Sequence, residues 1–69
     1  MAISDKLLRA KTISEVKPLA DEINQMIVYS DFTALKELVE QSETIENRSP
    51  LVNIWISIIK DYLKKHGQL

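Results

Sequence analysis

Residues 49–67 read SPLVNIWISIIKDYLKKHG, and this stretch decides the fold of the 69-residue chain. The Ser-Pro pair is typical of a helix start, and Gly67 after a basic last turn is typical of a helix end. Nine of the thirteen residues from 51 to 63 are apolar. At ~100° per residue they cover an arc of roughly 200°, which is wider than the stripe of an ordinary surface helix. The pattern therefore predicts a helix with two apolar faces.

One apolar face can pack inside this small chain, and the other is predicted to bind a partner. We expect the interface to include Leu51, Trp55, Ile58, Ile59, Tyr62 and Leu63. Aromatic residues dominate binding hot spots, and the simplest partner is a second copy, so we expect a homodimer. The alternative is a central helix that other helices of the same chain cover on most sides. We favour the interface because the helices predicted over about residues 4–10 and 31–41 are short and offer few apolar side chains to cover it.

Three further helices are predicted, over about residues 4–10, 14–29 and 31–41. The whole chain has one Gly and two Pro and little β-branched alternation, which favours an all-α fold with short connections. Because only a tight corner links the second and third helices, they are expected to form an antiparallel hairpin. The sequence thus predicts one domain over residues 1–69. It is a small three- to four-helix bundle in which this hairpin packs on the long C-terminal helix.

Two residues could cap the second helix. Thr12 opens a capping-box pattern that is completed by Glu15. A helix started by Thr12 would hold Pro18 in its interior, where proline removes a hydrogen bond and clashes with the preceding turn. We therefore predict Ser14 as the N-cap.

At 69 residues and 7.9 kDa, the chain is near the size below which a core needs additional stabilisation. Without Cys no disulfide can form, and with His66 as the only His a structural zinc site is not expected. Oligomerisation is the stabiliser that remains. The N-terminus has no apolar signal core, and no apolar run is longer than four residues. We expect a cytoplasmic chain with no membrane span.

No catalytic, metal or cofactor-binding residue is predicted. His66 lies at a helix end, where its charge would suit the helix dipole. The serines occupy cap and turn positions, and the acidic residues of the middle of the chain are spaced as a solvated helix face. We expect a protein without enzymatic activity.

Charge is unevenly distributed although the net charge is -1. Residues 21–46 carry seven acids and one base. Residues 1–20 carry four bases and two acids, and residues 47–69 carry four bases and one acid. The acidic middle is either an ordinary solvated face or a docking face for a basic partner.

Nucleic-acid binding would require a basic surface. The helix that follows the tight corner carries Lys36 between acidic neighbours, which phosphates would repel. A basic patch could form only if two groups came together: Lys6, Arg9 and Lys11 with Lys60, Lys64 and Lys65. We therefore do not expect nucleic acid as the partner.

The polar turn at 43–49 and the following LVNIWISIIK of residues 51–60 are similar to part of the small dimeric helical connector proteins that modulate bacterial two-component signalling. The similarity covers less than half of the chain, contains no diagnostic motif and assigns no role to any residue. We identify no family from it.

The sequence predicts a small non-enzymatic regulator, adaptor or inhibitor that acts by binding another protein. Two alternatives remain open: a nucleic-acid-binding dimeric regulator, and a structural or assembly subunit such as a secretion or filament component.

Overall fold

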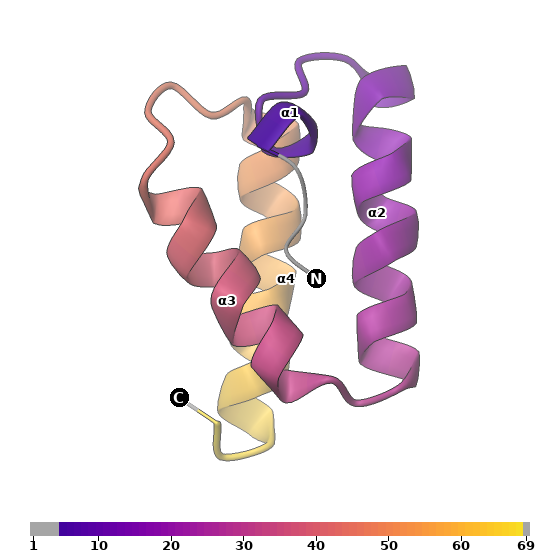
Figure 1. Cartoon of the computed structure of the whole chain (residues 1–69), viewed down its shortest axis with the longest axis vertical. Coiled ribbons are helices and arrows are strands. Elements are labelled where there is room, and N and C mark those ends of the chain that lie inside the picture. The colour runs from indigo at the N-terminus through magenta and orange to yellow at the C-terminus, as the bar shows by residue number, and fades with distance from the viewer. Residues whose placement is uncertain (1–4, 69) are drawn as a thin grey trace.

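The computed structural model describes residues 5–68, which form four helices and no strand (Figure 1). The helices are α1 (Asp5–Leu8), α2 (Ile13–Val28), α3 (Phe32–Glu43) and α4 (Pro50–Lys65). α3 runs antiparallel to both α2 and α4, so α2 and α4 run in the same direction (Figure 1). α1 lies at the end of the bundle where α2 and α4 begin. The predicted all-α bundle, with its hairpin packed on the C-terminal helix, is confirmed. The predicted start of the first helix, Ser4, lies outside the described residues.

The core lies between α2, α3 and α4, and Leu8 of α1 closes one end of it. Each of the three long helices contributes side chains that have almost no exposed surface: Leu19, Ile23, Leu35, Leu38, Val52, Ile56, Ile59 and Leu63. These residues recur at helical spacing of three and four, as the apolar pattern predicts.

The N-cap of α2 is Thr12, and the prediction of Ser14 is wrong. Thr12 Oγ1 accepts a hydrogen bond from the Glu15 N–H at 3.2 Å and donates one to Glu15 Oε1 at 3.1 Å. Pro18 lacks the N–H that would reach the Ser14 carbonyl, whichever residue caps the helix. The earlier start therefore costs no additional hydrogen bond, and it gains the Thr12 cap, which contributes about 1 kcal/mol.

The corner between α2 and α3 is built from two helix ends. Ser30 has a φ of 53°, and the N–H of Asp31 donates to the Met26 carbonyl at 2.9 Å. This closes α2 with a left-handed residue, although serine there costs ~1 kcal/mol or more compared with glycine. Asp31 then caps α3, because its carboxylate accepts from the Ala34 N–H at 3.2 Å. The predicted tight corner is confirmed.

Both ends of α4 follow the prediction. The Ser49 hydroxyl accepts from the Val52 N–H at 3.3 Å, and Pro50 is the first helical residue. At the other end Gly67 has a φ of 69°, and the Gln68 N–H reaches back to the Leu63 carbonyl at 2.8 Å. This is the left-handed helix ending that glycine favours.

The end of α3 lies two residues beyond the predicted one. Ser42, expected in a loop, is a fully buried helical residue whose hydroxyl donates to the Val39 carbonyl at 2.7 Å. Arg48 Nη1 donates to the Ser42 carbonyl at 3.0 Å and to its hydroxyl at 3.1 Å. The guanidinium thereby lies at the negative end of α3 and anchors the connection to α4.

None of the described helices combines the length and the apolarity needed to cross a membrane.

Candidate protein interface

α4 has two apolar sides that differ in their surroundings. Its inner side, made of Val52, Ile56, Ile59 and Leu63, is 0–3% exposed. Its other apolar side includes Ile54 at 57% and Ile58 at 41% exposure. A helix whose own chain covered it on every side would leave neither isoleucine in water.

The six predicted interface residues fall into two groups. Ile59 and Leu63 have 0% exposure, so their side chains belong to the core and have no surface left to offer a partner. We therefore leave both residues out of the interface that we propose below. Leu51, Trp55 and Tyr62 are half-buried at the edge of the core, and Ile58 is exposed. Ile54, the most exposed apolar residue of α4, is missing from the prediction.

The remaining apolar residues form a continuous line on α4, which we call the outer strip. It consists of Leu51, Trp55, Ile58 and Tyr62, with Ile54 beside it. Steps of four, three and four residues keep these side chains on one side of a helix, as in the seam of a coiled coil. The outer strip is therefore the type of surface that a second helix packs against.

Most of the outer strip lies on the side of α4 that is next to α2, and only its Tyr62 end reaches α3, at Phe32. On the opposite flank of α4, Lys60 Nζ lies 3.8 Å from Glu43 Oε1 of α3. On the outer strip itself, the Tyr62 hydroxyl donates to the Ile27 carbonyl of α2 at 3.4 Å. In Figure 1, α3 and α1 cross the near side of α4.

α2 adds apolar residues to the same outer side of the bundle. Ile13, Ala20 and Ile27 recur every seven residues, which places them on one line along the helix, and Ile27 lies at the Tyr62 contact. Ile13 is 78% exposed and Val28, one residue farther around the helix, is 77% exposed. The uncovered surface therefore extends over both α2 and α4.

One end of the outer strip is fixed by an aromatic cluster that the sequence did not predict. The Tyr62 ring stacks on Phe32 with centroids 5.8 Å apart, and it lies 4.4 Å from the His66 ring. The sequence predicts a role for His66 only through its charge at the helix end. Its ring instead packs on Phe32 and Tyr62, with a centroid distance of 5.6 Å to Phe32. Such aromatic pairs contribute ~0.5–1.5 kcal/mol each and hold Tyr62 in place.

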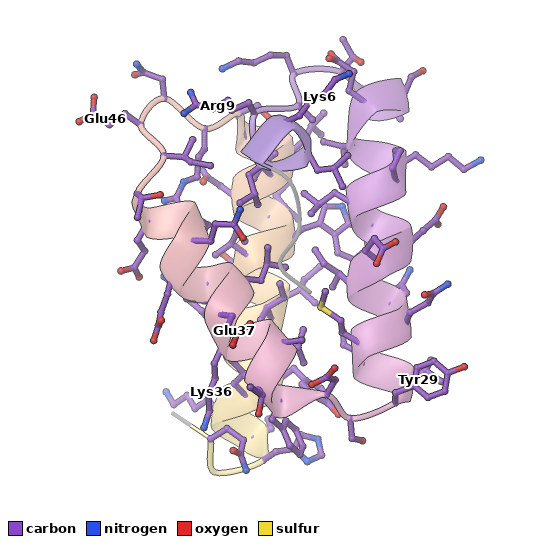
Figure 2. All side chains as sticks on the ribbon, in the orientation of Figure 1. Lys6, Arg9, Tyr29, Lys36, Glu37 and Glu46 are labelled. Atoms are coloured by element: carbon purple, nitrogen blue, oxygen red, sulfur yellow. The ribbon has the colours of Figure 1, made fainter. Side chains whose placement is uncertain are left out.

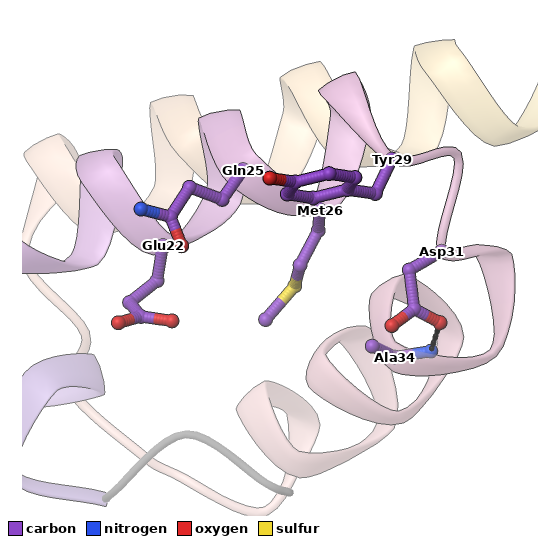
Figure 3. Close-up of a pocket in the computed structure, with 6 residues that line it drawn as sticks. All are labelled: Glu22, Gln25, Met26, Tyr29, Asp31 and Ala34. Atoms are coloured by element: carbon purple, nitrogen blue, oxygen red, sulfur yellow. Dashed lines mark hydrogen bonds between the residues drawn. The ribbon is translucent and has the colours of Figure 1, made fainter.

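A hollow of about 270 Å³ lies on the other flank of α2, facing α3 (Figure 3). Its lining residues are Glu22, Gln25, Met26, Tyr29, Asp31 and Ala34. The Met26 side chain projects into it, while both carboxylates belong to exposed residues. One of them, Asp31, is already the cap of α3. The hollow thus holds no buried acid or base of the kind that general acid–base chemistry uses.

The two basic groups of the sequence lie at opposite ends of the molecule. Lys6 and Arg9 lie at the end where α2 begins (Figure 2), and Lys11 Nζ donates to the Asn47 carbonyl at 2.8 Å near the start of α4. Lys64 and Lys65 are in the last turn of α4, ~20 Å away along a 16-residue helix. The basic patch that nucleic-acid binding would require is not assembled in one copy of the chain.

Within residues 5–68, no three His, Cys, Asp or Glu side chains are grouped so that they could hold a metal ion. Comparison of the chain with models of protein families, with curated proteins and with solved structures finds no match.

Proposed function

We propose that this chain is a non-enzymatic protein-interaction module that acts as a homodimer through the outer strip of α4. The observation that carries the proposal is the exposure of Ile54 and Ile58 beside the half-buried Leu51 and Trp55. Exposed apolar side chains that occur singly are normal, but a continuous apolar line along a helix is typical of a binding surface. The dimer would itself act as a regulator, adaptor or inhibitor by binding another protein.

Burial of this apolar surface would favour association. Burial of apolar surface contributes about 25 cal/mol per Å², and full burial of an isoleucine contributes ~1.5–3 kcal/mol relative to leaving it exposed. Trp55 provides a large side chain whose position is already held by the core, so little conformational freedom would be lost on binding.

The experiment that tests the proposal is molar mass by light scattering over a concentration series, with Ile58→Glu as the test variant. The wild type is expected near twice 7.9 kDa at high concentration, and Ile58→Glu near 7.9 kDa at all concentrations. A charge at the centre of an apolar interface must be desolvated without a partner, which opposes association.

Ser57→Glu is the matched control, because Ser57 is the exposed neighbour of Ile58 but points to the polar side of α4. It is expected to remain a dimer. Circular dichroism should show wild-type helicity for both variants. A wild type that stays monomeric at millimolar concentration, or an Ile58→Glu variant that still dimerises, would refute the proposal.

A further inference from the structure

The outer sides of α2 and α4 share a symmetry that indicates how two copies would pack. We propose that the second copy binds antiparallel about a two-fold axis, so that α4 packs on α4 and α2 packs on α2 across the interface. This inference rests on the homodimer proposed above and adds its geometry. The α2 and α4 pair of one copy would face the same pair of the second copy, with α3 of each copy on the outside.

The first observation is the spacing of the outer strip. Leu51, Trp55, Ile58 and Tyr62 are separated by four, three and four residues, and this spacing is the same read in either direction. A two-fold axis between positions 56 and 57 places Leu51 opposite Tyr62 of the second copy, and Trp55 opposite Ile58. An isologous interface requires this self-complementarity, because each residue pair occurs twice.

The second observation is that α2 repeats the symmetry at the same height. Tyr62 contacts Ile27, so a residue of α4 lies level with the residue about 35 positions earlier in α2. The midpoint of the outer strip is then level with positions 21 and 22. The midpoint of α2's exposed apolar ends, Ile13 and Val28, falls between 20 and 21. The two midpoints differ by about one residue, ~1.5 Å along the helix, so one axis serves both helices and places Ile13 close to Val28 of the second copy.

The residues between those ends fit a close helix pair. Ala20 would lie next to the axis, where its small side chain lets the two α2 helices approach each other. Lys17 would lie opposite Asn24 of the second copy, so that its charge faces a neutral polar side chain. Both residues are exposed in the single copy and would remain at the rim of the interface.

The size of the surface agrees with a stable dimer. Two helices of 16 residues each span a face of roughly 24 by 20 Å, or ~500 Å² in projection. A standard interface buries ~800 Å² per partner, so this face is within a factor of two of that area. A short peptide would leave much of this surface uncovered.

Electrostatics favour the antiparallel over the parallel arrangement. A parallel pair would bring together the two lysine-rich last turns, with Lys64 and Lys65 from both copies. It would also align the two helix dipoles side by side. The antiparallel pair places the C-terminal end of each α4 beside the N-terminal end of the other, which makes the dipoles complementary.

The absence of cysteine from the chain makes disulfide trapping a clean test of this geometry. Lys17→Cys and Asn24→Cys are prepared separately, mixed, and oxidised under native conditions. In the proposed dimer these two positions face each other, within the separation of ~4.4–6.8 Å between Cα atoms that a disulfide needs. Two copies of the same variant place their thiols seven residues apart along the axis, ~10 Å.

We expect the mixture to give a covalent heterodimer, identified by its mass, and each variant alone to give little covalent dimer. Gln25→Cys is the matched control for Asn24→Cys, because Gln25 is exposed on the flank that lines the hollow with α3. Mixed with Lys17→Cys, it should not cross-link. Each variant must first show the wild-type molar mass under reducing conditions.

The outcomes separate the two proposals. Efficient cross-linking of Lys17→Cys with itself would indicate a parallel pair and would overturn the antiparallel geometry. A dimer by light scattering that gives no mixed disulfide would also overturn it, while the homodimer itself would stand. A monomeric wild type would refute both.

Discussion

The two apolar sides of α4 are made of the same residue types but have different environments. Ile56 and Ile59 are 3% and 0% exposed, whereas Ile54 and Ile58, on the same helix, are 57% and 41% exposed. All four isoleucines lie within six consecutive positions. The comparison shows that the number of apolar residues in a helix does not determine how many of them its own domain can bury.

The difference arises from the number of neighbours that a small bundle provides. α2 and α3 both pack on α4 and together cover its inner side, while α1 has only four residues and lies at one end. No other described element remains to cover the outer strip. A larger domain would bury such a helix centrally, whereas this chain must use a second molecule or leave the surface in water.

The largest expected effect is that of removing an inner isoleucine. Ile59→Ala should lower the free energy of unfolding by ~2–5 kcal/mol, because it leaves a cavity between helices that cannot fully collapse. Urea denaturation followed by circular dichroism measures this loss. The loss should be similar at low and high protein concentration, since Ile59 has no exposed surface to share with a partner.

Asn53→Ala is a suitable reference for Ile59→Ala, because Asn53 is exposed on the same helix. Its effect should remain within about 0.5 kcal/mol. An Ile59→Ala variant as stable as this reference would contradict the placement of Ile59 in the core.

A smaller effect is expected at the border between the two sides. Trp55 is half-buried, contacting the core along one edge and forming part of the outer strip along the other. Trp55→Ala should lower the free energy of unfolding by ~2–3 kcal/mol, below the ~3–5 kcal/mol of a fully buried tryptophan. It should also shift sedimentation velocity toward a folded monomer. A large loss of stability with the dimer intact would place Trp55 wholly in the core.

Most of the fold could be predicted from the sequence because local signals agreed with one another. Ser49, Pro50 and Gly67 mark the ends of α4, and the Tyr29–Asp31 corner requires an antiparallel hairpin. These features act over a few residues, where the chemistry of caps and turns is nearly independent of the rest of the chain.

The errors in the predicted helix ends arise where the local structure depends on the hydrogen-bond partner of a polar group. The burial of Ser42 depends on Arg48, which lies six residues away and donates to it across the turn. From the sequence, Pro18 argues against the Thr12 cap because proline cannot donate a hydrogen bond to the Ser14 carbonyl. That hydrogen bond is missing whether the helix is capped by Thr12 or by Ser14, so it does not distinguish the two starts. Such cases require the hydrogen-bond partner of each group to be known.

The exposed apolar side of α4 was only partly predicted, for a related reason. Helical periodicity places Ile58 and Ile59 on adjacent lines of α4, ~100° apart, but both lie within one broad apolar arc. Where the core ends within that arc depends on the angle at which α2 and α3 approach. The sequence therefore indicated a spare apolar side without stating which residues form it.

The smallest intrinsic effect is expected for Ile58→Ala, and it provides the sharpest test of the comparison with Ile59. In dilute solution, where we expect a monomer, the free energy of unfolding should change by less than about 0.5 kcal/mol. A side chain that is 41% exposed buries little apolar surface in the single copy, and the higher helix propensity of alanine partly offsets its removal. At high concentration the same variant should become measurably less stable than the wild type, because dimerisation stabilises only a folded chain with an intact interface. Thermal unfolding over a hundredfold concentration range measures this difference. A penalty that does not depend on concentration would mean that Ile58 contributes to the core like Ile59, and that the two sides of α4 do not have separate roles.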